Sequence, residues 1–288
     1  MALVLVVLAM GCKMMSLPRA PAKRNNHDVD FHEALAFAKR ANAAYLRPSA
    51  IRARYSNKRV VVEQLPASEV QFFIVFDDQA QTQHIAVRGT SNLTNIRVDS
   101  EINPDPDPKL RVCLHRGFAS AGKELYERIR PHLKQGYGTT VTGHSLGGAL
   151  ATILGMHLSR DRLRLQRIIT FGQPKVTNLD GARRYQNLPI LRFVNHTDPV
   201  VDLPPLLSLR DRRWRYTHFG PEVILWTEKR FIYVEEHQVL SSAVLSFWAN
   251  LGQHDLAEHK IRAYLGNLNL KLNRAEEIRF EDRQRYSD

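Results

Sequence analysis

Hydrophobic and polar positions follow two periods along this chain, one typical of buried strands and the other of amphipathic helices. Short apolar runs bounded by polar, Gly or Pro residues predict strands at residues 60–65, 70–76, 84–87, 110–114, 167–171 and 190–194, and a hairpin at residues 223–226 and 231–234. Apolar positions at helical spacing predict helices at residues 30–46, 117–133, 149–158, 241–251 and 254–265. This alternation favours an α/β fold whose mostly parallel sheet has helices on both faces.

The strand-to-helix junction at residues 139–151 carries the most specific chemical signal. A β-branched run opens it, helix formers at residues 149–158 close it, and between them residues 143–147 (GHSLG) match the pattern Gly-x-Ser-x-Gly. The two glycines let strand and helix approach closely around a strained serine turn. The pattern therefore predicts Ser145 as a nucleophile and the backbone N–H of Leu146 as an oxyanion donor. Taken alone, the stretch also fits an ordinary strand-to-helix turn.

A serine nucleophile needs a base, and an acid that orients the base. In α/β hydrolases the acid follows the serine on a loop after a late strand, and the histidine comes last. Asp198 follows the strand predicted at residues 190–194, and Pro199 would stiffen the loop that presents it. Asp198 is therefore preferred as the acid, with Asp202 and Asp180 as alternatives.

Four histidines follow this acid and are candidate bases: His218, His237, His254 and His259. Sequence order alone does not choose among them, because an isolated histidine is more often a structural residue than a base. His259 lies near the end of the folded region, where the fold places its base, and His254 is the next candidate. A second oxyanion donor is expected where the strand at residues 84–87 stops, at Arg88-Gly89-Thr90-Ser91.

The N-terminal end has the features of an export signal. Its first ten residues are apolar, but a membrane-spanning helix needs roughly 20. Residues 8–12 (LAMGC) resemble the cleavage box of bacterial lipoproteins, in which the cysteine is lipidated. We therefore expect a signal peptide at residues 1–12, a lipid on Cys12 and a polar tether at residues 13–28. An uncleaved hydrophobic N-terminus is the alternative.

This organisation predicts a protein of the bacterial cell envelope, anchored to the membrane, with secretion as the alternative. The tether carries four basic residues next to the lipid surface, Lys13, Arg19, Lys23 and Arg24. One catalytic domain is expected at residues 29–270, followed by a charged, solvated tail at residues 271–288. Cys113 is the other cysteine of the chain, and two cysteines are too few for a disulfide framework.

The formal net charge of +12 over 288 residues is compatible with nucleic acid, anionic lipid or simple solubility. No nucleic-acid-binding motif accompanies it, so a nucleic-acid partner is not expected. The densest basic and aromatic run, at residues 210–216 (RDRRWRY), fits either membrane-surface contact or a solvated loop.

Seven sequence blocks, in the same order, resemble the class 3, fungal-type lipases of the α/β-hydrolase superfamily, in a bacterial form, from about residue 31 to residue 265. The blocks are RGTS at residues 88–91, HRGF at 115–118, TGHSLGGA at 142–149, TFGQPKV at 170–176, NHTDPV at 195–200, YTHFG at 216–220 and EHKIRAY at 258–264.

This resemblance implies a role for each matched site residue. It implies Ser145 as nucleophile, Asp198 as orienting acid, His259 as general base, and Thr90 and Leu146 as oxyanion donors. It implies no metal and no organic cofactor. The expected activity is hydrolysis of carboxylic esters of lipids, as in triacylglycerol lipases, with phospholipase A1 activity as the alternative and a lipase-like scaffold without catalysis as a third.

Two further expectations come from the same resemblance. His218 lies in a block that the family uses structurally, which lowers its rank as the base. Residues 91–100 match the lid segment of the family, but Ile96 stands where an aromatic residue is usual. A lid with less apolar surface makes strong interfacial activation less expected.

Overall fold

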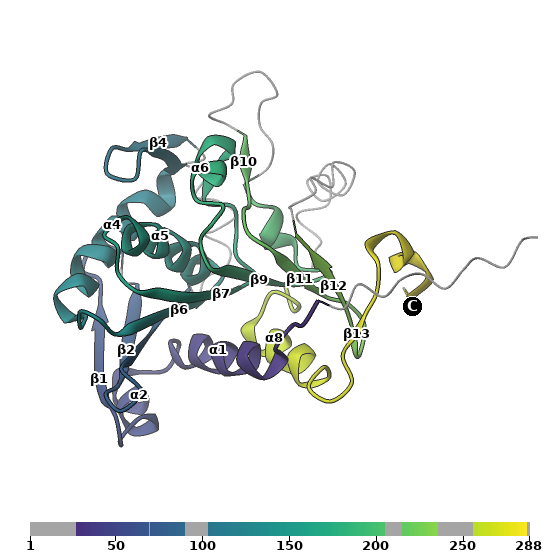
Figure 1. Ribbon diagram of the computed structural model, residues 1–288, viewed down its shortest axis with the longest axis horizontal. Helices are drawn as coiled ribbons and strands as arrows, with labels where there is room; N and C mark the ends of the chain where they lie inside the picture. Colours follow the sequence, from purple (N-terminus) through teal and green to yellow (C-terminus); the bar gives the residue numbers. More distant parts are fainter. Residues whose placement is uncertain (1–26, 69, 90–102, 205–214, 236–255, 287–288) are drawn as a thin grey trace, which may run out of the picture.

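The computed structural model describes residues 27–68, 70–89, 103–204, 215–235 and 256–286 (Figure 1). A nine-stranded sheet forms its middle layer, in the order β1-β2-β3-β6-β7-β9-β11-β12-β13. The strands are β1 (Arg59–Gln64), β2 (Gln71–Asp77), β3 (Thr82–Val87), β6 (Gly138–His144), β7 (Leu165–Phe171), β9 (Ile190–Asn195), β11 (Glu222–Leu225), β12 (Arg230–Val234) and β13 (Glu276–Glu277).

The centre of this sheet is parallel and its flanks are antiparallel. Strands β3, β6, β7, β9 and β11 run parallel to one another. In contrast, β2 pairs antiparallel with β1 and β3, and β12 pairs antiparallel with β11. Every strand run predicted above falls on a strand of the structure. The predicted mostly parallel sheet is confirmed.

Helices cover both faces of the sheet, which explains why its central strands read as continuous apolar runs. Helices α1 (Phe31–Ala43) and α8 (Ile261–Asn269) lie on one face, and α4 (Arg116–Ile129) and α5 (Leu146–Arg160) on the other (Figure 1). Along β2, Phe72, Ile74 and Phe76 pack into the core that contains α4 and α5. Phe73 and Val75 point the other way and pack with the residues around α2 (Pro48–Arg54).

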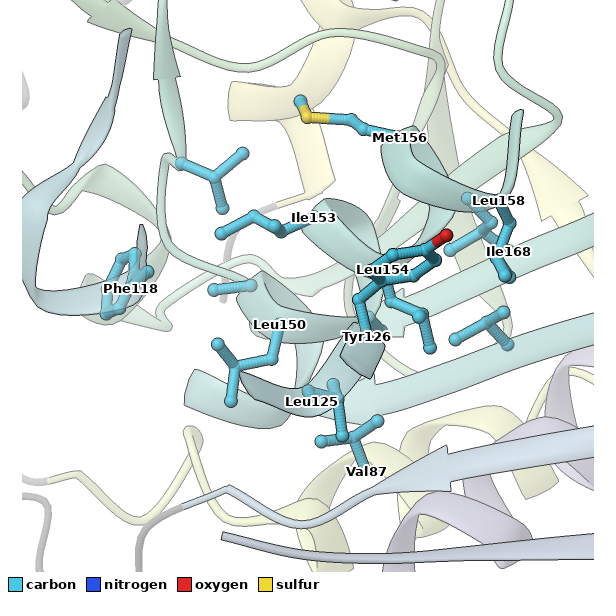
Figure 2. Packing of buried hydrophobic residues seen from close by; sticks show 14 of the residues in the cluster. Val87, Phe118, Leu125, Tyr126, Leu150, Ile153, Leu154, Met156, Leu158 and Ile168 are labelled. Atoms are coloured by element: carbon cyan, nitrogen blue, oxygen red, sulfur yellow. The ribbon is translucent and has the colours of Figure 1, made fainter. Parts of the chain in front are cut away.

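Helix α5, which begins directly after Ser145, is the most deeply buried helix on its face. Leu150, Ile153 and Leu154 are fully buried between the sheet and α4 (Figure 2). A Cβ added to Gly122 of α4 would lie 2.6 Å from Ile153 Cγ2, so glycine allows the two helices to approach closely. Burial of each large apolar side chain contributes roughly 1.5–3 kcal/mol, so the start of α5 is firmly placed.

A second, four-stranded sheet has the order β10-β8-β5-β4. It consists of β4 (Pro104–Asp107), β5 (Val112–His115), β8 (Thr177–Asn178) and β10 (Tyr216–Thr217). Strand β4, in which prolines alternate with aspartates, pairs antiparallel with β5. Strands β8 and β10 have two residues each, too few for a recognisable period.

Two helix predictions need correction. The helix predicted at residues 30–46 is shorter, and Asp30 caps its start by accepting the Glu33 N–H at 2.9 Å. Pro48 begins α2, because its fixed φ suits a first helical position. The helix predicted at residues 254–265 begins only at Ile261, after the turn that holds His259. The predicted helix at residues 241–251 lies outside the described residues.

The C-terminal segment is not a solvated tail. Strand β13 extends the main sheet by pairing parallel with β12. Ile278 is buried against the outer strands of the sheet, and Lys271 is buried with its ammonium donating to the carbonyls of residues 226, 228 and 267. The charged composition concealed the buried Ile278, and Phe280 and Tyr286 pack against the same cluster. Residues 1–26, with the predicted signal and most of the tether, lie outside the described residues.

Candidate active site

Ser145 occupies the turn between β6 and α5, and its backbone has a φ of 58° and a ψ of −129°. Positive φ is strained for a residue with a Cβ, by about 1–3 kcal/mol, and persists only where the surroundings enforce it. Here a Cβ at Gly143 would lie 2.1 Å from the carbonyl oxygen of Gly147, and one at Gly147 would lie 2.3 Å from that of Val87. The close approach predicted from the two glycines is therefore present.

His259 and Asp198 form a fully buried pair. The Nδ1 atom of His259 lies 2.9 Å from Oδ1 and 2.8 Å from Oδ2 of Asp198. Because a carboxylate only accepts hydrogen bonds, Nδ1 carries the proton and the neutral ring presents a lone pair on Nε2. Within the part of the chain that the structure describes, neither His259 Nε2 nor Ser145 Oγ has a hydrogen-bond partner.

The serine turn and this pair meet at the carboxyl edge of the sheet. The Ser145 N–H donates to the carbonyl of Phe171 at 2.9 Å. The next residue, Gly172, lies so close to the pair that an added Cβ would be 2.7 Å from Asp198 Oδ2 and 3.0 Å from His259 Nδ1. Open α/β sheets place their sites at this edge, where parallel strands end. The structure thus brings together the three residues that the sequence suggested as nucleophile, acid and base.

The surroundings of Asp198 favour its ionised form. Burial alone would raise the pKa of its carboxyl group, but the charge and hydrogen bond of His259 and further hydrogen bonds from Tyr264 and the Val200 N–H hold that pKa below its usual value. A buried carboxylate in contact with Nδ1 fixes the tautomer of the ring and stabilises an imidazolium. The arrangement can therefore take a proton at His259 Nε2.

Comparison with known proteins shows which family part of the chain is similar to. Residues 84–208 match the family model described as lipase (class 3), which spans the Ser145 turn and Asp198. Over these residues the chain is similar to the class 3 lipases. It is 31% identical over 191 residues to the chloroplastic phospholipase A1 PLIP2 of Arabidopsis thaliana, covering 62% of this chain and 26% of that protein. It is 30% identical over 151 residues to a lipase of Rhizopus niveus, covering 48% of this chain and 38% of that protein.

The chain therefore spans well under half the length of these curated relatives. A solved lipase from Rhizopus microsporus var. chinensis superposes with a TM-score of 0.63 at 22% identity, over 79% of this chain and 85% of that one. A solved triacylglycerol lipase superposes with a TM-score of 0.60 at 21% identity, over 79% of this chain and 92% of that one. These likenesses confirm the predicted α/β-hydrolase fold.

Tyr264 is a site residue that sequence reasoning missed. Its hydroxyl donates to Asp198 Oδ2 at 2.5 Å and accepts the N–H of Asn195 at 3.1 Å. It lies in the first turns of α8 and is fully buried. Tyr264 lies in the sequence block at residues 258–264 that resembles the family, but that resemblance assigned it no role. Helical spacing alone indicates only a buried core position.

The structure describes only some of the other residues that the sequence suggested for the site. As first residue of α5, Leu146 has a backbone N–H without a partner inside the helix, as an oxyanion donor requires. Thr90 and the predicted lid at residues 91–100 lie outside the described residues, as do His237 and His254. His218 is buried, and its Nε2 lies 2.8 Å from the carbonyl oxygen of Val201, which fits the structural use that the family suggested.

The alternative acids occupy other positions. Asp180 lies in the first turn of α6 (Leu179–Arg184). Asp202 lies in the short helix η2 (Pro199–Asp202), where burial raises the pKa of its carboxyl group. Asp198 receives the hydrogen bonds of His259. In the described ranges, no group of His, Cys, Asp or Glu residues is arranged to hold a metal ion, and no helix is both long and apolar enough to cross a membrane.

Proposed function

We propose that this protein is a class 3 lipase that hydrolyses carboxylic esters of lipids through a covalent acyl-enzyme on Ser145. The observation that carries the proposal is the buried His259–Asp198 pair at the sheet edge that also holds the strained Ser145 turn. A triacylglycerol lipase of the same fold has a serine protease triad as its catalytic centre, which supports this reading.

The proposed reaction follows from the proton positions. His259 Nε2 accepts the proton of Ser145 as its hydroxyl attacks the ester carbonyl, and Asp198 stabilises the imidazolium. The N–H of Leu146, with Thr90 as the proposed second donor, stabilises the tetrahedral oxyanion; one such donor contributes about 10²–10³ in rate. His259 then protonates the leaving alcohol and activates the water that releases the acid.

Substitution of the nucleophile tests this mechanism. Ser145→Ala should abolish turnover of a short-chain ester and covalent labelling by a fluorophosphonate, while the melting temperature of the protein stays close to that of wild type. Wild-type protein that neither reacts with the fluorophosphonate nor hydrolyses any ester would instead support the non-catalytic scaffold.

We propose acylglycerols as the substrate class, with phospholipids as the second candidate. The relative that the chain matches over 191 residues is a phospholipase A1, and a net charge of +12 would concentrate the protein at anionic lipid. Full-length protein in detergent should be compared on emulsified triacylglycerol and on phosphatidylglycerol/phosphatidylethanolamine vesicles. Fatty acid released mainly from the vesicles would replace the lipase assignment with that of a phospholipase.

We further propose that the protein is anchored in the bacterial cell envelope through lipid on Cys12. The support is the sequence LAMGC at residues 8–12 and the basic tether that follows it. Two or more acyl chains give durable attachment, at about 0.8 kcal/mol per buried methylene. Cys12→Ser should move the protein from the membrane fraction to the soluble fraction, and unchanged membrane association would refute lipidation at this residue.

A further inference from the structure

His144, which precedes the proposed nucleophile, takes no part in the mechanism above, yet it contacts the base. Its ring lies at the end of β6, almost completely buried, with its centroid 4.8 Å from that of His259. Nε2 of His144 lies 2.5 Å from the backbone carbonyl oxygen of His259. Nδ1 of His144 lies 2.8 Å from the hydroxyl of Tyr45, just beyond the end of α1.

The partners of His144 fix the direction of these hydrogen bonds. A carbonyl oxygen only accepts, so His144 Nε2 carries the proton and donates it to the carbonyl of His259. Nδ1 of His144 is then an acceptor, and the Tyr45 hydroxyl must donate to it. Burial lowers the pKa of His144 to about 3, so the ring stays neutral in this one tautomer under ordinary conditions.

Tyr45 also contacts the strand end that leads to the proposed oxyanion donor. A Cβ placed on Gly89 would lie 2.5 Å from the Tyr45 hydroxyl, 2.5 Å from the carbonyl oxygen of His144 and 3.3 Å from Ser145 Cβ. Gly89 directly precedes Thr90 in the sequence. The Tyr45 hydroxyl is therefore the point at which α1, the end of β3 and the serine turn come together.

We propose that Tyr45 and His144 are positioning residues, which hold the backbone of His259 and the Gly89 strand end in register with Ser145. The proposal rests on the ester-hydrolase function proposed above. The Asp198 contact fixes the rotation of the His259 ring, whereas the His144 contact fixes the main chain that carries the ring. An error of about 1 Å in such a group can lower a rate a hundredfold.

The test compares removal of each hydrogen bond with its conservative replacement. Tyr45→Phe removes the hydroxyl and leaves Nδ1 of His144 buried without a donor. His144→Leu removes both hydrogen bonds. His144→Gln keeps one amide donor for the carbonyl of His259 and one acceptor for the Tyr45 hydroxyl. Tyr185→Phe is the matched control, because this buried tyrosine donates to the Leu110 carbonyl at 3.2 Å, outside the site.

The readouts are kcat and KM on a soluble short-chain ester, the rate of fluorophosphonate labelling of Ser145, and the melting temperature. Tyr45→Phe should lower kcat about tenfold and His144→Leu about a hundredfold, with KM within about twofold of wild type. His144→Gln should recover most of the loss caused by His144→Leu. Tyr185→Phe should leave kcat unchanged.

Several outcomes would overturn the proposal. They are a kcat of Tyr45→Phe within twofold of wild type, a loss that appears in KM alone, or a folded His144→Gln variant as slow as His144→Leu, which would mean that the ring acts by packing. Wild-type protein without turnover or labelling would refute the proposed function, and the positioning role with it. Active wild type with unaffected variants would refute the positioning role alone.

Discussion

The Ser145 turn and the segment that presents His259 are held in place by different means. Around Ser145 the constraint is steric, because a Cβ on Gly143 would meet the backbone of Gly147, and a Cβ on Gly147 would meet the backbone of Val87 at the end of β3. His259 lies in a turn before α8 instead, where it is placed by hydrogen bonds from residues far away in sequence. Its Nδ1 proton is held by Asp198, 61 residues earlier in the chain.

The distant contacts of the His259 segment are numerous. The side chain of Asn195 donates to the carbonyl of Glu258 at 2.7 Å, and His144 contacts the carbonyl of His259 itself. Tyr264, in α8, donates a further hydrogen bond to Asp198. A steric constraint that requires glycine at two fixed positions leaves a readable motif, whereas a position fixed by hydrogen bonds from several distant residues does not.

The largest effect is expected from substitution of Asp198, which lies at the centre of the hydrogen-bond network around His259. In Asp198→Asn the amide nitrogen would face His259 Nδ1, so the ring would protonate on Nε2 and could no longer accept the Ser145 proton. We expect kcat to fall by about 10⁴-fold while folding is retained. Steady-state ester hydrolysis and the melting temperature measure the two effects separately.

Asp202→Asn is the matched control, because this half-buried carboxyl group does not contact His259 through any interaction described above. It should change kcat by less than about tenfold. If Asp202→Asn had the larger effect, the acid would have to be reassigned, and the buried His259–Asp198 pair would be structural.

The steric constraint around Ser145 should be disrupted by a single methyl group added at Gly147. In Gly147→Ala the new Cβ would lie 2.3 Å from the backbone oxygen of Val87, so strand and helix must separate. We expect the free energy of unfolding to fall by about 3 kcal/mol and turnover to be lost with the displaced Ser145. Denaturant unfolding followed by circular dichroism measures the first effect.

Gly266→Ala serves as its control, since a Cβ at this position in α8 would meet nothing within 4 Å. Glycine inside a helix is less favourable than alanine, so Gly266→Ala should raise the free energy of unfolding by about 0.5–1 kcal/mol. A Gly147→Ala variant as stable as Gly266→Ala would show that the turn at Ser145 can relax.

The same distinction explains what the sequence could and could not predict. The central parallel strands were readable because both of their faces are buried, as the alternate packing of Phe72 and Phe73 shows. The place of Ser145 followed from its two glycines. The strands of two residues and the burial of Ile278 could not be predicted from the periodicity of apolar residues. Pairing with a distant strand creates them, and the local sequence pattern does not.

For the candidate site, the order of residues along the chain reduced the candidates for the general base to four histidines, and the family resemblance favoured His259. Nothing in the local sequence of Tyr264 or Tyr45 marks a hydroxyl that contacts Asp198 or His144, since both tyrosines occupy apolar positions of helical stretches. Such contacts depend on how α1 and α8 lie beside the sheet, and local periodicity carries no information about that placement.

The smallest effect, and the sharpest contrast between the two regions, is expected in mild acid. His157, near the far end of α5, is buried against the ring of Tyr126, and both of its ring nitrogens lack hydrogen-bond partners among the described residues. Burial lowers its pKa from 6.5 to about 4. Between these values the unfolded chain binds more protons than the folded one, so stability falls as the pH decreases from 6.5 towards 4.

Asp198 behaves differently, because its lowered pKa preserves its contribution until the pH falls below the range in which a free aspartate titrates. His157 should therefore lower stability in mild acid, whereas Asp198 should not. His157→Met, which cannot be protonated, should lower the pH midpoint of acid unfolding by about half a unit. His32→Gln, at an exposed position of α1, should leave it unchanged. Equal midpoints for His157→Met and wild type would show that α5 does not limit acid stability.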